Sequence, residues 1–108
     1  MIVELLYFDG CPNLEVARAQ LQAALVNCGA TTRVELVRMT GDATAQAMKF
    51  LGSPSVRING RDVDPDAEAS RDFGLQCRVY TTSAGLQGTP PKEWITAAIV
   101  AAQAKKPT

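Results

Sequence analysis

The residues of this chain best suited to chemistry are its three cysteines, Cys11, Cys28 and Cys77. The sequence contains no histidine, so no imidazole is available to activate a nucleophile or to bind a metal ion. A reactive cysteine must therefore draw on another source of positive charge. An odd number of widely spaced cysteines does not make the disulfide framework of a small secreted protein, and the expected compartment is the reducing cytoplasm.

Cys11 is the strongest candidate for a reactive thiol. It follows an apolar run and precedes Pro12, a residue type that suits the first position of a helix. The first turn of a helix has unpaired backbone N–H groups at the positive end of the helix dipole, and these favour a thiolate. We predict that Cys11 is the nucleophile, with Arg57 or Arg78 as a further source of positive charge. The simpler alternative is that Cys11 is a small capping residue.

The other two cysteines are expected to differ in role. Cys77 lies in residues 64–91, a long surface loop that starts at the same edge of the predicted sheet as Cys11. It could act as the resolving thiol that reduces a mixed disulfide at Cys11, or as the second thiolate ligand of a soft-metal ion. The alternative, given equal weight, is a buried or unreactive cysteine. Cys28 falls on the apolar stripe of the first helix and is predicted to lie in the core.

Apolar periodicity predicts an alternation of strands and helices. The Asn59-Gly60 pair between residues 55–58 and 61–63 indicates a hairpin of two short strands with a type I′ turn. Gly29 and Gly52 are expected to end the first two helices. The predicted strands cover residues 2–8, 33–39, 55–58 and 61–63, and the predicted helices cover residues 12–28, 43–51 and 92 onward, before a tail at 105–108.

These elements predict one α/β domain over residues 1–108, in the order β-α-β-α-β-β-α. We expect a mixed four-stranded sheet with helices on both faces and a long loop, residues 64–91, before the last helix.

Composition argues against several classes of partner. The chain has 11 Lys and Arg residues and 11 Asp and Glu residues, scattered along its length, so neither nucleic acid nor a membrane is an expected partner. No apolar run is long enough to span a membrane, and the apolar start resembles a strand more than a secretory signal. Asp62, Asp64 and Asp66 are expected in a solvated turn, because they do not match a calcium loop. No cofactor and no metal site follow from these residues.

The element order resembles that of the thioredoxin fold. The resemblance depends on Gly10-Cys11-Pro12 at the first strand-to-helix junction and on the segment from Gly52 to Val56, which contains Ser53-Pro54, before the third strand. It implies a cis peptide bond at Ser53–Pro54 beside Cys11. It also implies that Pro12, Ser53 and Pro54 bind the substrate, with the Ser53 backbone pairing with an extended peptide or a glutathione-like thiol.

Three segments give a narrower resemblance to small bacterial thioredoxin-family proteins, some of which are labelled alkylmercury lyase-like. These segments are residues 7–13, 50–54 and 77–80. The chain departs from thioredoxins at one position, because Leu14 stands where the second cysteine of a C-x-x-C motif would be. A dithiol within one helical turn is therefore excluded.

The leading hypothesis is a thiol-based redox protein that performs thiol-disulfide exchange or glutathione-linked reduction. Cys11 would attack, and Cys77 or external glutathione would resolve the intermediate. One alternative is a protein that binds a thiophilic ion such as mercury or copper, with alkylmercury lyase-like cleavage as its enzymatic extension. Another is a thioredoxin-like adaptor without chemistry. The sequence leaves the electron donor, the substrate and the oligomeric state open.

Overall fold

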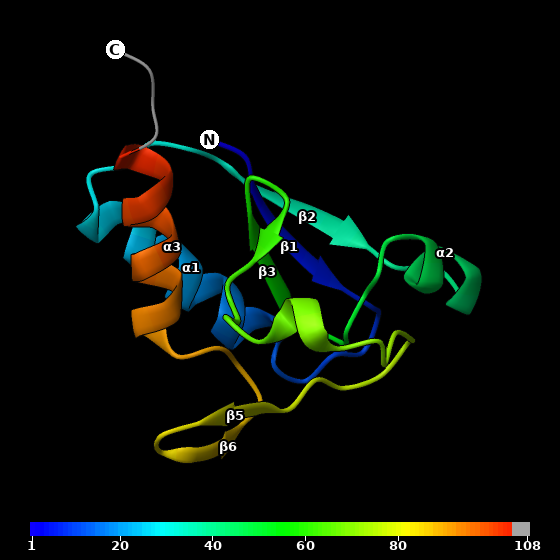
Figure 1. The fold of residues 1–108 in the computed structure, drawn as a ribbon. Helices are drawn as coiled ribbons and strands as arrows, with labels where there is room; N and C mark the ends of the chain where they lie inside the picture. The colour runs from blue at the N-terminus through cyan, green and yellow to red at the C-terminus, as the bar shows by residue number, and fades with distance from the viewer. Residues whose placement is uncertain (105–108) are drawn as a thin grey trace.

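The computed structural model describes residues 1–104 and has a four-stranded mixed sheet with three helices (Figure 1). The predicted α/β class is confirmed, and the predicted tail at 105–108 lies outside the described residues. The strands of the sheet are β1 (Val3–Tyr7), β2 (Val34–Arg38), β3 (Ser55–Ile58) and β4 (Arg61–Asp62), and the helices are α1 (Leu14–Asn27), α2 (Asp42–Ala47) and α3 (Lys92–Ala104).

The strand order is β2-β1-β3-β4. β1 runs parallel to β2 and antiparallel to β3, and β3 runs antiparallel to β4. The central strands β1 and β3 are largely buried on both faces, which explains the nearly continuous apolar run of β1, whereas β3 alternates Ser55 and Arg57 with Val56 and Ile58.

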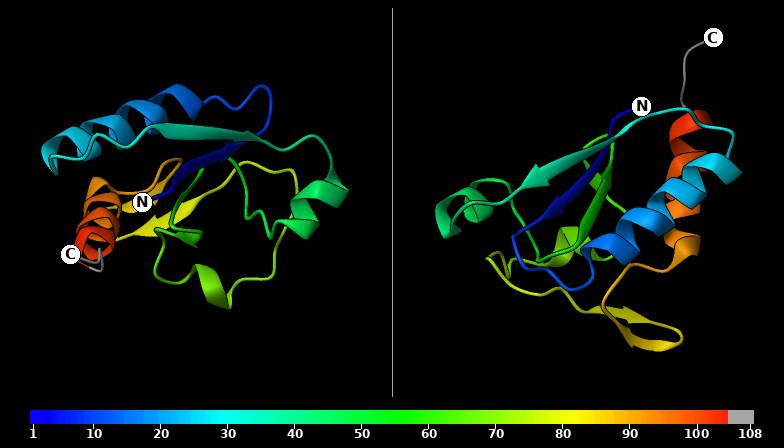
Figure 2. Two further views of the ribbon diagram at one scale, coloured as in Figure 1. Left: turned by 90° about the horizontal axis from the view of Figure 1, so that it is seen from above. Right: turned by 180° about the vertical axis from the view of Figure 1, so that it is seen from behind.

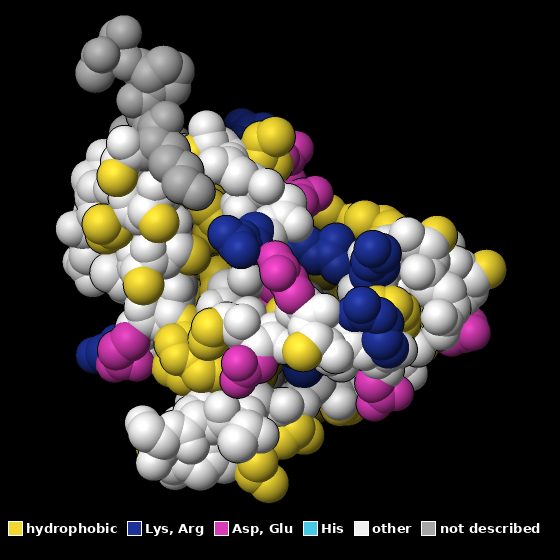
Figure 3. Space-filling view, viewed as in Figure 1, with side chains coloured by type: hydrophobic (Ala, Val, Ile, Leu, Met, Phe, Trp, Pro, Cys, Tyr) yellow, Lys and Arg dark blue, Asp and Glu magenta, His cyan; other side chains and the backbone are white. Residues whose placement is uncertain are grey.

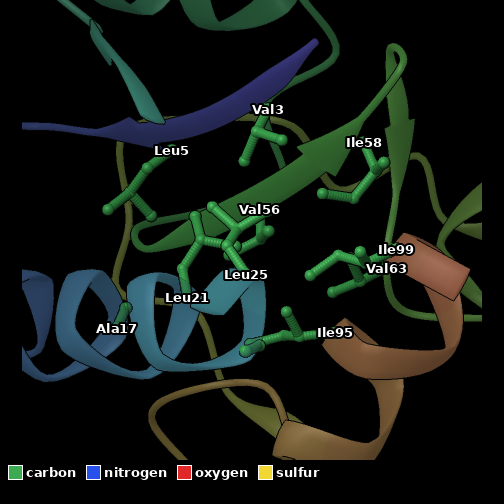
Figure 4. Close-up of a cluster of buried hydrophobic side chains, with 11 residues drawn as sticks. Val3, Leu5, Ala17, Leu21, Leu25, Val56, Ile58, Val63, Ile95 and Ile99 are labelled. Atoms are coloured by element: carbon green, nitrogen blue, oxygen red, sulfur yellow. The ribbon is translucent and has the colours of Figure 1, made fainter. Parts of the chain in front are cut away.

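Helices α1 and α3 lie side by side on one face of the sheet (Figure 2). Alternate side chains of β1 and β3 point toward them, and Figure 4 shows the resulting cluster. Burial of one such aliphatic side chain contributes about 1.5–3 kcal/mol. The main contributors are Val3 and Leu5 of β1, Val56 and Ile58 of β3, Leu21 and Leu25 of α1, and Ile95 and Ile99 of α3.

The opposite face of the sheet carries a smaller core. Leu6 alternates with Leu5 along β1 and packs with Met39, Ala45 of α2 and Phe50. The short helix α2 therefore covers the second face, and the prediction of helices on both faces is confirmed.

The first helix starts two residues later than predicted, at Leu14 instead of Pro12. The Cys11 N–H donates to the Phe8 carbonyl at 3.3 Å, and the Leu14 N–H donates to the Cys11 carbonyl at 3.4 Å. These two successive turns carry the chain out of β1, and α1 begins only at Leu14, with Asn13 as its N-cap. Cys11 consequently lies in the turn before the helix instead of in its first turn.

The second helix ends earlier than predicted, at Ala47. Lys49 adopts a left-handed conformation with φ 54°, and the Phe50 N–H donates to the Ala45 carbonyl at 2.8 Å. This ending turns Phe50 into the small core. Gly52 therefore does not end the helix.

The predicted hairpin between β3 and β4 is confirmed. Asn59 and Gly60 have φ values of 54° and 80°, as a type I′ turn requires. Asn59 also exchanges hydrogen bonds with Ile2, because its backbone N–H donates to the Ile2 carbonyl at 2.7 Å and its Oδ1 accepts from the Ile2 N–H at 2.8 Å.

Residues 64–91 do not form the surface loop that was predicted. The segment contains a short 3₁₀ helix, η1 (Ala67–Ala69), and a two-stranded hairpin of β5 (Tyr80–Thr82) and β6 (Gly85–Gln87). It also buries Arg78, Tyr80 and Pro90. The prediction failed because burial here depends on partners elsewhere in the chain. Among residues 1–104, no helix is long and apolar enough to cross a membrane.

Candidate functional site

Cys11 is a free, half-buried cysteine in the turn between β1 and α1. Asp9, two residues earlier, forms an exposed ion pair with Arg38 at 2.5 Å. Because that pair is exposed and screened, it exerts only a weak field on its surroundings. Pro12 is exposed beside Cys11.

The Ser53–Pro54 peptide bond is cis, as the resemblance implied. The antiparallel register places Ser55 opposite Leu6 of β1, so Ser53 and Pro54 lie at the end of the sheet where β1 leaves it for the Cys11 turn. Pro54 is fully buried, and its carbonyl accepts a hydrogen bond from the Tyr80 hydroxyl at 2.5 Å.

Cys77 reaches the same place through its backbone. Ser53 and Cys77 form an isolated parallel β-bridge, in which the Ser53 N–H donates to the Gln76 carbonyl at 2.8 Å and the Arg78 N–H donates to the Ser53 carbonyl at 3.0 Å. Both backbone groups that were expected to pair with a substrate are thus bonded to the chain itself. An extended peptide could pair with Ser53 only by displacing residues 76–78.

The two candidate thiols face different surroundings. Cys77 is exposed and lines a cleft of about 340 Å³ together with Asp64, Asp66 and Asp72. Cys11 is not among the residues that line this cleft. The structure therefore brings the Cys77 backbone to Ser53 but does not place both thiols in this cleft.

The Ser53 side chain is an unsatisfied polar group at this site. Its residue is 1% exposed, and its hydroxyl has no hydrogen-bond partner among the described residues. Buried hydroxyls in folded proteins normally have a partner, so an orphan at the junction of β1, β3 and residues 76–78 marks a functional candidate.

Sequence reasoning missed a buried charge cluster centred on Arg78, which is 6% exposed. Its guanidinium donates to both carboxylate oxygens of Asp62, at 2.6 and 3.1 Å, and to the Ser55 hydroxyl at 2.9 Å. It also contacts the Asp64 carboxylate at 3.4 Å and lies 4.3 Å from the centre of the Tyr80 ring. The solvated turn expected for Asp62 and Asp64 was wrong, because both carboxylates neutralise a buried arginine.

The cluster shifts the pKa of two of its members. Burial opposes the charged form of Arg78, but the hydrogen bond to Asp62 and the nearby carboxylates outweigh it and raise the pKa of the guanidinium. Burial raises the pKa of Tyr80 well above its ordinary value, and the positive charge of Arg78 opposes that rise. The sequence carries one signal for this cluster. Arg78 and Tyr80 are two residues apart, as are Asp62 and Asp64, so in an extended chain the two side chains of each pair lie on the same side.

The two arginines proposed to assist Cys11 are both engaged elsewhere. Arg78 is paired with Asp62, and the Nη2 of Arg57 donates to the carbonyls of Met48 and Lys49 at 2.7 and 3.1 Å. Neither contact set includes Cys11.

Cys28 is half-buried at the C-cap of α1 and packs against the main core, in partial agreement with its predicted core position. Within residues 1–104, no group of three or more Cys, His, Asp or Glu residues is arranged to hold a metal ion.

Comparison with known proteins identifies no relative: no protein-family model, no curated protein and no solved structure matches the chain.

Proposed function

We propose that this chain is a thioredoxin-like, thiol-based redox protein that reacts through Cys11. The observation that carries the proposal is a free, half-buried cysteine in the turn after β1, at the end of the sheet where buried Ser53-Pro54 also lies and where Ser53 forms a β-bridge with Cys77. The strand order, with β1 parallel to β2 and antiparallel to β3, supports the thioredoxin-like arrangement.

The reaction is a thiol-disulfide exchange. The Cys11 thiolate attacks one sulfur of a substrate disulfide, and the other sulfur leaves as a thiolate with the electron pair of the broken bond. A second thiol then attacks the Cys11 sulfur of the mixed disulfide and releases the remaining half of the substrate. The substrate gains two electrons, and the attacking thiols lose them. Cys77 is the proposed second thiol, and external glutathione is the substitute.

The bonds between Ser53 and residues 76–78 favour a small substrate. A low-molecular-weight disulfide needs access only to the Cys11 sulfur, whereas an extended peptide must also break two backbone hydrogen bonds before pairing with Ser53. We therefore expect oxidised glutathione to react faster than a disulfide-linked peptide.

The test is mass spectrometry of the protein after mild treatment with oxidised glutathione. We expect the adduct on Cys11, loss of all adduct formation at this site in Cys11→Ser, and accumulation of the mixed disulfide in Cys77→Ser. Cys28→Ser is the matched control, because Cys28 lies at the far end of α1. This substitution should change neither adduct formation at Cys11 nor its resolution. Equal labelling of all three cysteines would contradict the proposal.

The same variants separate the alternative functions. A mercury- or copper-binding protein would bind mercuric ion through two thiols, and its affinity would fall in both Cys11→Ser and Cys77→Ser. An adaptor without chemistry would keep all of its binding in Cys11→Ser. A disulfide between Cys11 and Cys77 requires a Cα separation of about 4.4–6.8 Å. If Cys11 is glutathionylated but no Cys11–Cys77 disulfide forms, external glutathione is the resolving thiol.

A further inference from the structure

A second site is an open cleft that Cys11 does not line, between the segment after α2, the β3–β4 hairpin and residues 64–73. The cleft has a volume of about 780 Å³, within the range of about 300–1,000 Å³ typical of small-molecule sites. Lys and Arg side chains gather on this face of the molecule (Figure 3). Four of them line the cleft, and they come from separate parts of the chain: Lys49, Arg57, Arg61 and Arg71.

The carboxylates of the cleft cancel only part of this positive charge. Asp62 and Asp64 are paired with Arg78, and Glu68 is paired with Arg61 at 3.3 Å. In the part of the chain that the structure describes, Lys49, Arg57 and Arg71 form no ion pair. With Arg78 included, five cations face three carboxylates, so the cleft and its borders carry an excess of two positive charges.

Neutral backbone acceptors hold the two arginines of this set in place. Arg57 Nη2 donates to the carbonyls that follow α2, and Arg71 Nη1 donates to the carbonyls of Glu68 and Ser70 at 2.8 and 3.1 Å. Such bonds orient a guanidinium without neutralising it, and each guanidinium retains N–H donors for a ligand. Two oriented, uncompensated guanidinium groups are suited to a ligand with two negative charges.

The cleft also has an apolar part. Met48, Leu51 and Phe73 line it, and each is half-buried. We propose that this cleft binds a small organic dianion, a phosphate monoester or a dicarboxylate, through Arg57 and Arg71 with an aromatic or aliphatic portion against Phe73. This site is independent of the chemistry at Cys11.

The test is a titration followed by amide chemical shifts, with phenyl phosphate and phthalate as the charged probes and phenol as the uncharged probe. We expect saturable shifts at residues 48–51, 57–61 and 67–73 with both charged probes and none with phenol. If only phenyl phosphate binds, the ligand class is the phosphate monoester, and if only phthalate binds, it is the dicarboxylate.

Charge variants complete the test. Arg57→Gln and Arg71→Gln should each weaken binding about tenfold, as expected for loss of one charge-assisted hydrogen bond. Arg33→Gln removes the same charge from an exposed position outside the cleft and should leave affinity unchanged. Because Arg71 is exposed, Arg71→Gln should retain the wild-type melting temperature and remain informative even if Arg57→Gln unfolds. Equal weakening by Arg33→Gln, or equal shifts with phenol, would overturn the proposal.

Discussion

Tyr80 shows how a single buried polar residue connects distant parts of this chain. It is fully buried, its hydroxyl donates to the Pro54 carbonyl, and its ring contacts Trp94 edge-on with 6.2 Å between ring centroids. The guanidinium of Arg78 lies over the ring as a cation–π partner. Ionisation of the phenol would remove the hydrogen-bond donor and place a negative charge in the core.

The raised pKa of Tyr80 predicts a loss of stability at alkaline pH. The folded protein holds the phenolic proton more tightly than the unfolded chain, whose tyrosine has the ordinary pKa of 10.0. The stabilisation is therefore complete below that pH and is lost as the pH rises through the folded-state pKa. We expect the free energy of unfolding to fall as the pH rises above about 10, measured by urea titration at each pH.

Phenylalanine variants separate this effect from general alkaline unfolding. Tyr80→Phe keeps the ring but cannot ionise, so its stability should fall less steeply over the same pH range. Tyr7→Phe, at a half-buried position in β1, is the control and should follow the wild type. An identical pH dependence in all three proteins would refute this role for Tyr80.

At the scale of the elements, Gly52 permits residues 76–78 to pack against the start of β3. Gly52 has φ +125°, and a Cβ at this position would lie 2.9 Å from the Cβ of Arg78 and 3.0 Å from the Gln76 carbonyl oxygen. The close approach allows the bridge between Ser53 and Cys77 to form. Gly52 therefore serves strand pairing instead of helix termination.

We predict that Gly52→Ala destabilises the protein more than Gly60→Ala does. Gly60 also has a positive φ, of +80°, but a Cβ there would meet no heavy atom within 4 Å, so alanine incurs only a backbone cost of about 1–2 kcal/mol. At Gly52 the clash with Arg78 adds about 1–3 kcal/mol. Urea unfolding monitored by the single tryptophan, Trp94, measures both values.

The Gly52 prediction has a second readout at Cys77. If residues 76–78 are displaced, the Cys77 thiol should react faster with a thiol reagent in Gly52→Ala than in Gly60→Ala. Equal stabilities and equal thiol reactivities in the two variants would show that the close approach is not needed.

At the scale of the whole molecule, Arg78 fastens the segment of residues 64–91 to the sheet. It contacts β3 through Ser55 and β4 through Asp62, while its own backbone bonds to Ser53. The hairpin of β5 and β6 continues directly from this anchor (Figure 1). Loss of the anchor should therefore affect the docking of the whole segment.

We predict that Arg78→Met destabilises the protein by about 3 kcal/mol or more, because it leaves Asp62, whose side chain is 11% exposed, without a partner. Arg61→Met is the matched control. It breaks an ion pair whose side chains are 72% and 80% exposed, and such pairs contribute about 1 kcal/mol or less. Thermal unfolding gives the stabilities, and limited proteolysis should show cleavage within residues 64–91 only in Arg78→Met.

Much of the fold could be predicted from the sequence because the signals are local. The apolar run of β1 locates the first strand, Asn59-Gly60 locates the hairpin of β3 and β4, and the periodic apolar residues of α1 and α3 locate the two large helices. The position of Cys11 in the turn after β1 follows from the same local patterns. The boundaries of α1 and α2 could not be predicted. The start of α1 is set by the backbone hydrogen bonds of Cys11, and the end of α2 is set by the burial of Phe50 in the smaller core.

Local sequence patterns predict the four strands of the main sheet, the three helices and a position for Cys11 after the first strand, but not the 3₁₀ helix or the hairpin of β5 and β6. Three features appear only in the folded chain: the β-bridge between Ser53 and Cys77, the burial of Arg78 against Asp62, and the gathering of distant cations around one cleft. The physical reason is that hydrophobic periodicity acts within a few residues, whereas these contacts join residues 14 or more apart, whose charges and hydrogen-bonding groups show no partner until the chain is folded.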